Sequence, residues 1–214
     1  MTVYNDQVSG YISELFAQED AALERARQDS PARGLPAINI KPEEGKFLQF
    51  LVRASGAMKA VEIGTLGGYS GIWIARGLPP GGKLFTLEIQ PAHAEVARQH
   101  FEAAGILDRV EVRIGEANQL LGDLAGEAPF DFIFIDADKP GYPAYLDWAL
   151  ENIRLGGIIA AHNAFRKGSV MGLSEPDAYT EIMQDFNHRF AHEERLLSII
   201  YPAGDGTLVG VRVA

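Results

Sequence analysis

The feature that most constrains the fold is a glycine-rich turn between two apolar runs. Residues 60–63 form a short apolar run that contains Glu62, glycines follow at positions 64, 67, 68 and 71, and Glu88 ends the next apolar run. This order is typical of a strand, a turn, a helix and a second strand. Glycine has no Cβ, so the backbone can approach a ligand closely, and an acid that ends the second strand can hold the two hydroxyls of a ribose. The pattern predicts a pocket for a nucleoside cofactor.

The details of this turn favour a positively charged cofactor over a dinucleotide. Dinucleotide-binding turns usually carry G-x-G-x-x-G, in which the second glycine lets a pyrophosphate reach the helix N-terminus. Leu66 stands at that second position, and the carboxylate of Glu62 would repel a pyrophosphate but attract a cationic ligand. The turn therefore favours a sulfonium-bearing cofactor over NAD. An ordinary glycine-rich turn of another α/β protein is the alternative, because an isolated glycine pattern is weak evidence.

Composition sets further bounds. The chain has 214 residues, 47% of them hydrophobic, which is enough for one substantial core, so we expect a single main domain. A net charge of −10 argues against a nucleic-acid partner and suits a metal ion or a cationic ligand better. The absence of cysteine excludes disulfides, thiolate metal sites and cysteine nucleophiles. The polar start has no leader pattern and no apolar run is long enough to span a bilayer, so we expect a soluble, cytoplasmic protein with no membrane partner.

Residues 1–35 are predicted to form a helical arm before the main domain at residues 36–214. The first helix carries apolar residues at helical spacing on one face, namely Val8, Tyr11, Ile12, Leu15 and Phe16. A charged helical stretch follows and is predicted to end at Pro31. Two interpretations stay open: the arm packs on its own domain or on a second subunit, or it acts as a lid over the substrate.

From residue 60 onward, short β-branched or aromatic runs alternate with helical stretches, as in βαβ units around a largely parallel sheet. We predict five such strands, at residues 60–63, 83–87, 110–114, 130–135 and 157–161, with helices at 70–76, 91–104, 118–124 and 142–153. A helix near 176–190 precedes two runs at 195–200 and 207–213, which are predicted to form an antiparallel hairpin. The prediction is a Rossmann-like α/β fold with a seven-stranded, mostly parallel sheet, a C-terminal antiparallel hairpin and helices on both faces.

Charged and polar side chains follow the fourth and fifth of these strands. Asp136, Asp138 and Lys139 come after one strand, and His162 and Asn163 come at the end of the next. Ligands of an open α/β sheet bind beyond the carboxyl ends of its strands, so Asp136, His162 and Asn163 are predicted to meet there as donors for a divalent cation. Lys139, beside them, is a candidate proton acceptor. The alternatives are a solvated loop in which one acid caps the next helix, and a His-Asn pair that binds no metal.

Three separated motifs resemble one known family. Residues 61–71 resemble an EIGT-x-x-GYS cofactor turn, residues 136–139 a DADK motif, and residues 204–206 a Gly-Asp-Gly turn near the end of the chain. In this order they are similar to the cation-dependent class I S-adenosylmethionine O-methyltransferases, which include the catechol and caffeoyl-CoA types. The resemblance covers residues 38–214. It implies the class I methyltransferase sheet, S-adenosylmethionine (SAM) as the cofactor and, from the family alone, a homodimer.

The resemblance also implies roles for individual residues. Residues 115–117 are expected beside the adenine, residues 38–40 over cofactor and substrate, and Ser70 at the methionine carboxylate, although Ser70 alone could be a helix cap. The implied cofactor-binding residues are Ile40, Glu62, Gly64, Thr65, Ser70, Glu88, Gly115, Ala117 and Asp136. The implied catalytic residues are Lys139 as general base, Asp136 and His162, and the implied metal ligands are Asp136, His162 and Asn163.

One departure from the family lies in the predicted metal site. The family carries Asp-Asn after the fifth strand, whereas this chain carries His162-Asn163. Imidazole in place of a carboxylate removes a negative charge and a hard oxygen donor, so Mg²⁺ binding should weaken and Mn, Co, Fe or Zn ions should fit better. Such a site should lose metal as falling pH protonates His162, and a site without metal stays open as an alternative. Pro140 and Gly141 also differ from the plant members, which favours small substrates over acyl-CoA.

The predicted reaction is methyl transfer from SAM to a small aromatic acceptor with two vicinal hydroxyls. A cation would chelate both hydroxyls and lower the pKa of one, and Lys139, its own pKa lowered by the cation and by burial, would remove that proton. Without a metal, His162 becomes a candidate base. A catalytically silent SAM-binding protein and an NAD(P)-dependent oxidoreductase are the rival functions, and Leu66 and residues 136–139 disfavour the latter.

Overall fold

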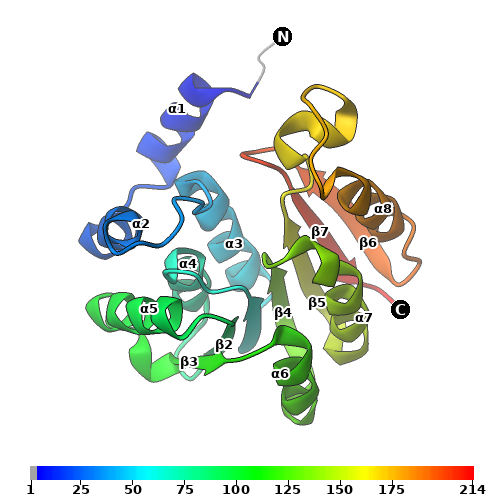
Figure 1. The fold of residues 1–214 in the computed structure, drawn as a ribbon. Helices are drawn as coiled ribbons and strands as arrows, with labels where there is room; N and C mark the ends of the chain where they lie inside the picture. Colours follow the sequence, from blue (N-terminus) through cyan, green and yellow to red (C-terminus); the bar gives the residue numbers. More distant parts are fainter. Residues whose placement is uncertain (1–3) are drawn as a thin grey trace.

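A seven-stranded mixed sheet organises the structure, a computed structural model that describes residues 4–214. The strand order is β3-β2-β1-β4-β5-β7-β6 (Figure 1). β1 to β5 pair in parallel, and β7 pairs antiparallel with both β5 and β6. The strands are β1 (Lys59–Ile63), β2 (Lys83–Glu88), β3 (Val110–Ile114), β4 (Phe130–Ile135), β5 (Ile153–His162), β6 (Leu196–Tyr201) and β7 (Thr207–Arg212). This arrangement confirms the predicted fold class.

Helices cover both faces of the sheet (Figure 1). They are α1 (Asp6–Phe16), α2 (Ala21–Ala32), α3 (Pro42–Ala54), α4 (Tyr69–Gly77), α5 (Pro91–Ala103), α6 (Ala117–Leu124), α7 (Tyr142–Asn152) and α8 (Thr180–Ala191). Buried side chains of α2 to α5 pack on one face of the sheet, and those of α6 to α8 pack on the other. Among residues 4–214 no helix combines the length and the hydropathy needed to cross a bilayer.

Burial on both faces explains why the central strands are largely apolar. Successive residues of a strand point to opposite faces of its sheet. In β4, Phe132 and Phe134 join the core beneath α2 to α5, whereas Ile133 and Ile135 join the core beneath α6 to α8. All four side chains are buried. The run therefore places Asp136, the first polar residue after it, directly at the carboxyl edge of the sheet.

Four elements differ from the sequence prediction. α3 was not predicted, although Pro42 stands in its first turn. α2 continues past Pro31 to Ala32, without the hydrogen bond that a backbone N–H at position 31 would donate. β5 begins at Ile153 rather than at residue 157. Gly156 and Gly157 lie inside the strand, at a shift in its register with β4, and not in a turn before it. α8 begins at Thr180 rather than near residue 176.

The amino-terminal arm is held on its own chain. Leu23 of α2 is buried in the core with α4 and α5. α1 packs on α3 through the buried carboxylate of Glu43, which accepts hydrogen bonds from the hydroxyls of Tyr4 and Ser9 and, at 2.7 Å, from that of Ser13. The predicted apolar face of α1 is largely uncovered, however, with Tyr11, Leu15 and Phe16 exposed. The lid interpretation stays a prediction.

Candidate functional site

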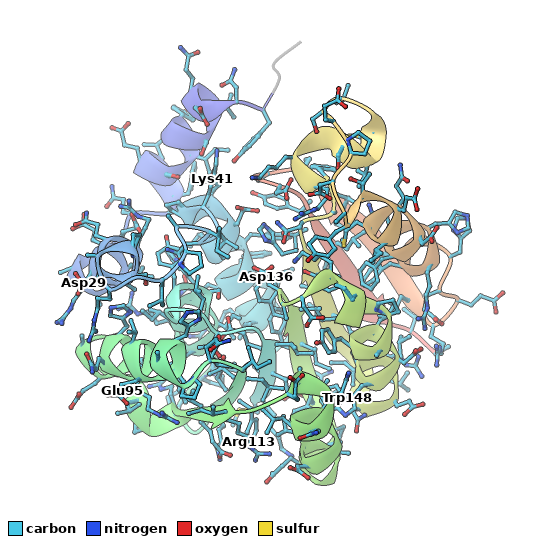
Figure 2. All side chains as sticks on the ribbon, in the orientation of Figure 1. Asp29, Lys41, Glu95, Arg113, Asp136 and Trp148 are labelled. Carbon is cyan, nitrogen blue, oxygen red and sulfur yellow. The ribbon has the colours of Figure 1, made fainter. Side chains whose placement is uncertain are left out.

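A cavity of about 980 Å³ lies beyond the carboxyl ends of the parallel strands. The part beyond β1, β2 and β3 is called here the turn half. The part beyond β4 and β5, closed by the start of α3, is called the ionic half. Figure 2 shows Asp136, which joins the two, near the centre of the molecule with Lys41 above it. The predicted site residues that line the cavity are Ile40, Gly64, Thr65, Ser70, Glu88, Gly115, Ala117, Asp136, Lys139, His162 and Asn163; Glu62 does not line it.

Backbone geometry fixes the turn half. Gly64 has a φ of +101°, and a Cβ there would overlap with the carbonyl oxygen of Asp136, so only glycine fits between the ends of β1 and β4. The N–H of Leu66 donates to Glu88 Oε2 at 2.7 Å, and the N–H of Gln90 donates to Glu88 Oε1 at 2.9 Å. The Glu88 carboxylate is thus held by the backbone on both oxygens and keeps lone pairs for a ligand in the cavity.

Glu62 is fully buried behind the turn rather than on the cavity wall. Ser70 Oγ donates to Glu62 Oε1 at 2.6 Å, and Thr86 Oγ1 donates to Glu62 Oε2 at 2.6 Å. Burial raises the pKa of Glu62 to about 7, although both hydroxyl hydrogen bonds act in the opposite direction. Because Ser70 itself lines the cavity, Glu62 acts in this structure by positioning Ser70.

Two further segments line the turn half. Gly115, with a φ of +151°, donates its N–H to the carbonyl oxygen of Glu88 at 2.9 Å and brings the start of α6 at Ala117 to the cavity. Residues 38–40 approach from the other side. Ile40 is buried in the core while Ile38 is exposed, so the predicted core contact holds for Ile40 alone.

Lys139 is the centre of the ionic half. Its buried ammonium group donates three hydrogen bonds, to Asp136 Oδ1 at 3.3 Å, to the carbonyl oxygen of Ala137 at 3.0 Å and to the hydroxyl of Tyr142 at 2.6 Å. Burial lowers the pKa of Lys139, and the charge of Asp136 offsets part of that effect. The amine is therefore closer to neutrality than an exposed lysine.

His162 lies between two carboxylates. Its Nε2 is 2.9 Å from Glu44 Oε1, and its Nδ1 is 3.3 Å from Asp136 Oδ2. Burial by itself would lower the pKa of His162, but the charges of Asp136 and Glu44 outweigh it and raise this pKa to about 10. Burial would likewise raise the pKa of Asp136, but the charges of His162 and Lys139 lower it. His162 is thus held as an imidazolium at neutral pH.

Asn163, which follows His162, is tied to Asp205. With a φ of +62°, it directs its amide nitrogen to Asp205 Oδ2 at 2.8 Å. Asp205 Oδ1 accepts the N–H of Lys167 at 2.5 Å, so the Gly-Asp-Gly turn fixes the loop after β5. The sequence motif at residues 204–206 therefore has a structural role at the rim of the cavity.

Glu44 and Tyr142 were not predicted as site residues. Glu44 stands in the first turn of α3, where its Oε2 accepts the N–H of Lys41 at 2.9 Å. Pro42 followed by acids is a helix-start signal that could have located this turn. Nothing in the local sequence indicates that Glu44 reaches His162, because the two are 118 residues apart.

Comparison with known proteins identifies the family. The chain matches the O-methyltransferase family over residues 13–213. It is 44% identical over 184 residues to a catechol O-methyltransferase of Niastella koreensis, covering 85% of this chain and 83% of that protein. It is 45% identical over 168 residues to a catechol O-methyltransferase of Mycobacterium tuberculosis, covering 78% and 76%.

The chain belongs to the O-methyltransferase family. A solved O-methyltransferase from Bacillus cereus in complex with SAH has a TM-score of 0.87 and 42% identity, with 96% of this chain and 97% of that one covered. The predicted family and enzyme class, a SAM-dependent O-methyltransferase, are thereby confirmed.

The predicted cation ligands of this O-methyltransferase do not fit a divalent cation as a set. Both ring nitrogens of His162 face carboxylates, so the imidazolium has no lone pair for a metal and would repel one. Asn163, whose amide nitrogen donates to Asp205, offers only its amide oxygen. Within residues 4–214 no three His, Asp or Glu side chains are placed to hold a metal ion together. No reaction step is therefore assigned to a cation below.

Proposed function

We propose that this O-methyltransferase transfers a methyl group from SAM to one hydroxyl of a small, catechol-like aromatic acceptor. The observation that carries the proposal is a cavity that joins the turn fixed by Glu88 to the group around Lys139. The names of the relatives from Niastella koreensis and Mycobacterium tuberculosis support a catechol-like acceptor. The Bacillus cereus structure in complex with SAH supports the cofactor.

The turn half suits SAM. The two oxygens of Glu88, held by backbone N–H groups, can accept the two ribose hydroxyls. Ser70, in the first turn of α4, is proposed to meet the methionine carboxylate with its backbone N–H, because its hydroxyl already donates to Glu62. The other residues proposed to contact the cofactor are Ile40, Gly64, Thr65, Gly115, Ala117 and Asp136, all of which line the cavity. When bound, SAM would supply the methyl group on a positively charged sulfur.

Lys139 is the proposed general base. In its neutral form it would accept the proton of the acceptor hydroxyl as the new bond from oxygen to methyl forms and the bond from sulfur to methyl breaks. Tyr142, 2.6 Å from Nζ, can donate its hydroxyl hydrogen to the neutral amine and accept from the ammonium, so it holds both states in place. Asp136 then balances the ammonium that results.

His162 is not favoured as the base. A base needs a free lone pair, and both ring nitrogens of His162 are engaged with Glu44 and Asp136. The metal-independent alternative with His162 as the base therefore has no support from this geometry.

Methyl transfer from labelled SAM to a panel of catechols tests the proposal. We expect a singly O-methylated product, formed with both wild-type protein and protein carrying the exposed substitution Glu95→Ala. SAM binding without transfer to any acceptor would instead favour a silent binding protein. Oxidation of an acceptor with NAD(P) would favour an oxidoreductase.

Assembly and location remain predictions. The exposed residues Tyr11, Leu15 and Phe16 of α1 give the proposed homodimer an apolar surface to cover. Sedimentation at several protein concentrations would test it, and a monomer throughout would refute it. Cytoplasmic location would be tested by fractionation of the source cells.

A further inference from the structure

We propose that the ring of His162, clamped between Glu44 and Asp136, supplies the positive charge of the ionic half, so that this enzyme transfers methyl groups without a divalent cation. The inference rests on the proposed function for its catalytic consequence. The clamp itself rests on the contacts of three segments, α3, the end of β4 and the end of β5.

The contacts of the ring decide its charge. A neutral imidazole has one N–H and one nitrogen lone pair. In a neutral ring at this place, that lone pair would point at a carboxylate oxygen and repel it. Here Nε2 is 2.9 Å from Glu44 and Nδ1 is 3.3 Å from Asp136, and His162 is largely buried at the wall of the cavity. With a carboxylate at each nitrogen, one hydrogen-bonded to Nε2 and one ion-paired with Nδ1, we infer that the ring is an imidazolium.

Two further contacts hold the Glu44 carboxylate against His162. The backbone N–H of Lys41 holds Glu44 Oε2 at 2.9 Å, which leaves Oε1 directed at the ring. Gly204, with a φ of +57°, lies so close that a Cβ would overlap with the Glu44 carboxylate. The glycine of the Gly-Asp-Gly motif thus leaves room for the carboxylate that pairs with His162.

Charge balance removes the need for a further cation. When Lys139 is protonated, the carboxylates of Glu44 and Asp136 are matched by the imidazolium of His162 and the ammonium of Lys139, and contacts of 2.9 to 3.3 Å join all four groups. An aspartate in place of His162 would add a negative charge and remove a positive one. The cluster would then carry two excess negative charges, which a divalent cation would neutralise.

A fixed cation at this place would favour the anionic form of the acceptor. The charge of His162 acts through the electric field rather than by a direct bond, because both N–H groups are engaged. His162 is therefore proposed to act on the acceptor only through its charge, whereas Lys139 accepts the proton. The second hydroxyl of a catechol would not be needed for chelation.

Direct metal binding and activity test the inference together. Mn²⁺ is titrated into the wild-type enzyme and into His162→Asp, with free Mn²⁺ followed by electron paramagnetic resonance, and methyl transfer is measured with and without chelator. We expect wild-type activity to change by less than about twofold on chelation, and His162→Asp to bind Mn²⁺ at least about tenfold more tightly and to lose activity on chelation. His162→Gln, which removes the charge without adding a carboxylate, should lose activity that Mn²⁺ does not restore.

Several results would overturn the inference. Stoichiometric Mn²⁺ binding by the wild-type enzyme, or wild-type activity that disappears with chelator and returns with Mn²⁺, would show a working metal site despite the clamp. These two measurements need no variant, so a misfolded His162→Asp leaves the inference testable. If no acceptor is methylated at all, the proposed function fails, while the Mn²⁺ titration still decides whether the clamped site binds a cation.

Discussion

The two halves of the cavity are built in different ways. The turn half depends on the backbone: glycines with positive φ, and a carboxylate, Glu88, held by two N–H groups close to it in the chain or the sheet. The ionic half depends on side chains from distant segments, such as Glu44 and His162, which are 118 residues apart. A backbone-built site tolerates few changes of conformation, whereas a site built from side-chain charges can change its chemistry through one substitution, as we propose for position 162.

The largest expected effect concerns the ionic half. Lys139→Ala removes the proposed base and should lower kcat by about 10² to 10⁴-fold, with the dissociation constant of SAM nearly unchanged. Rapid-quench kinetics at saturating SAM, together with calorimetry of SAM binding, would measure both quantities. Because Lys139 belongs to the ionic half alone, kcat should fall and the dissociation constant of SAM should not change.

Lys139→Arg is the matched control. Arginine keeps the positive charge but does not deprotonate in proteins, so activity should be lost as completely as in Lys139→Ala. Substantial activity of Lys139→Arg would mean that position 139 contributes charge alone. Wild-type kcat in Lys139→Ala would remove this residue from the mechanism.

A smaller effect is expected in the turn half. Glu88→Ala removes the carboxylate proposed to hold the ribose and should weaken SAM binding by about 10 to 100-fold, since a hydrogen bond to a charged group contributes roughly 1.5–3 kcal/mol. At saturating SAM, kcat should stay within a few-fold of the wild type. Calorimetry and initial-rate kinetics would check this separation, with the exposed Glu95→Ala on α5 as the control. A fall of kcat as large as that of Lys139→Ala would contradict the division of roles.

The residues of these predictions, Lys139 and Glu88, could both be located from the sequence. The turn half could be located from a local sequence pattern, because Gly64, Ser70 and Glu88 belong to one continuous strand-turn-helix-strand unit. The sequence also placed Lys139 and His162 at the correct edge of the sheet, since parallel strands end together.

The remaining features depend on long-range contacts that local patterns do not carry. Gly64 is required by the carbonyl oxygen of Asp136, and His162 is clamped by Glu44 from a helix that was not predicted. Glu62 was predicted on the cavity wall, but the hydroxyls of Ser70 and Thr86 hold it behind the turn. Side-chain direction at a strand end is set by such partners, and these come from other parts of the chain.

A further expected effect is on stability and concerns Glu62. Its pKa is raised from 4.5 to about 7 by burial, so between these values the folded protein binds a proton that the unfolded chain releases. The resulting stabilisation is complete below pH 4.5 and is lost as the pH rises through 7. Relative to Glu62→Gln, which mimics the protonated acid, the wild type should lose on the order of 3 kcal/mol of unfolding free energy over this interval.

Urea unfolding of both proteins without cofactor, repeated across the pH series, measures this difference. Parallel stability curves for the wild type and Glu62→Gln would mean that Glu62 ionises freely in the folded state. The turn half would then be more hydrated behind Ser70 than its burial indicates.

The clamp on His162 is the point at which the two halves differ most, and it can be observed directly. Nitrogen-15 NMR of the ring, assigned by comparison with His162→Gln, reports how many of its nitrogens carry a proton. Because the pKa of His162 is raised to about 10, both nitrogens should be protonated at neutral pH, with couplings to the Glu44 and Asp136 carboxylates. A neutral ring with one protonated nitrogen would contradict the fixed charge and leave a lone pair free for a metal ion.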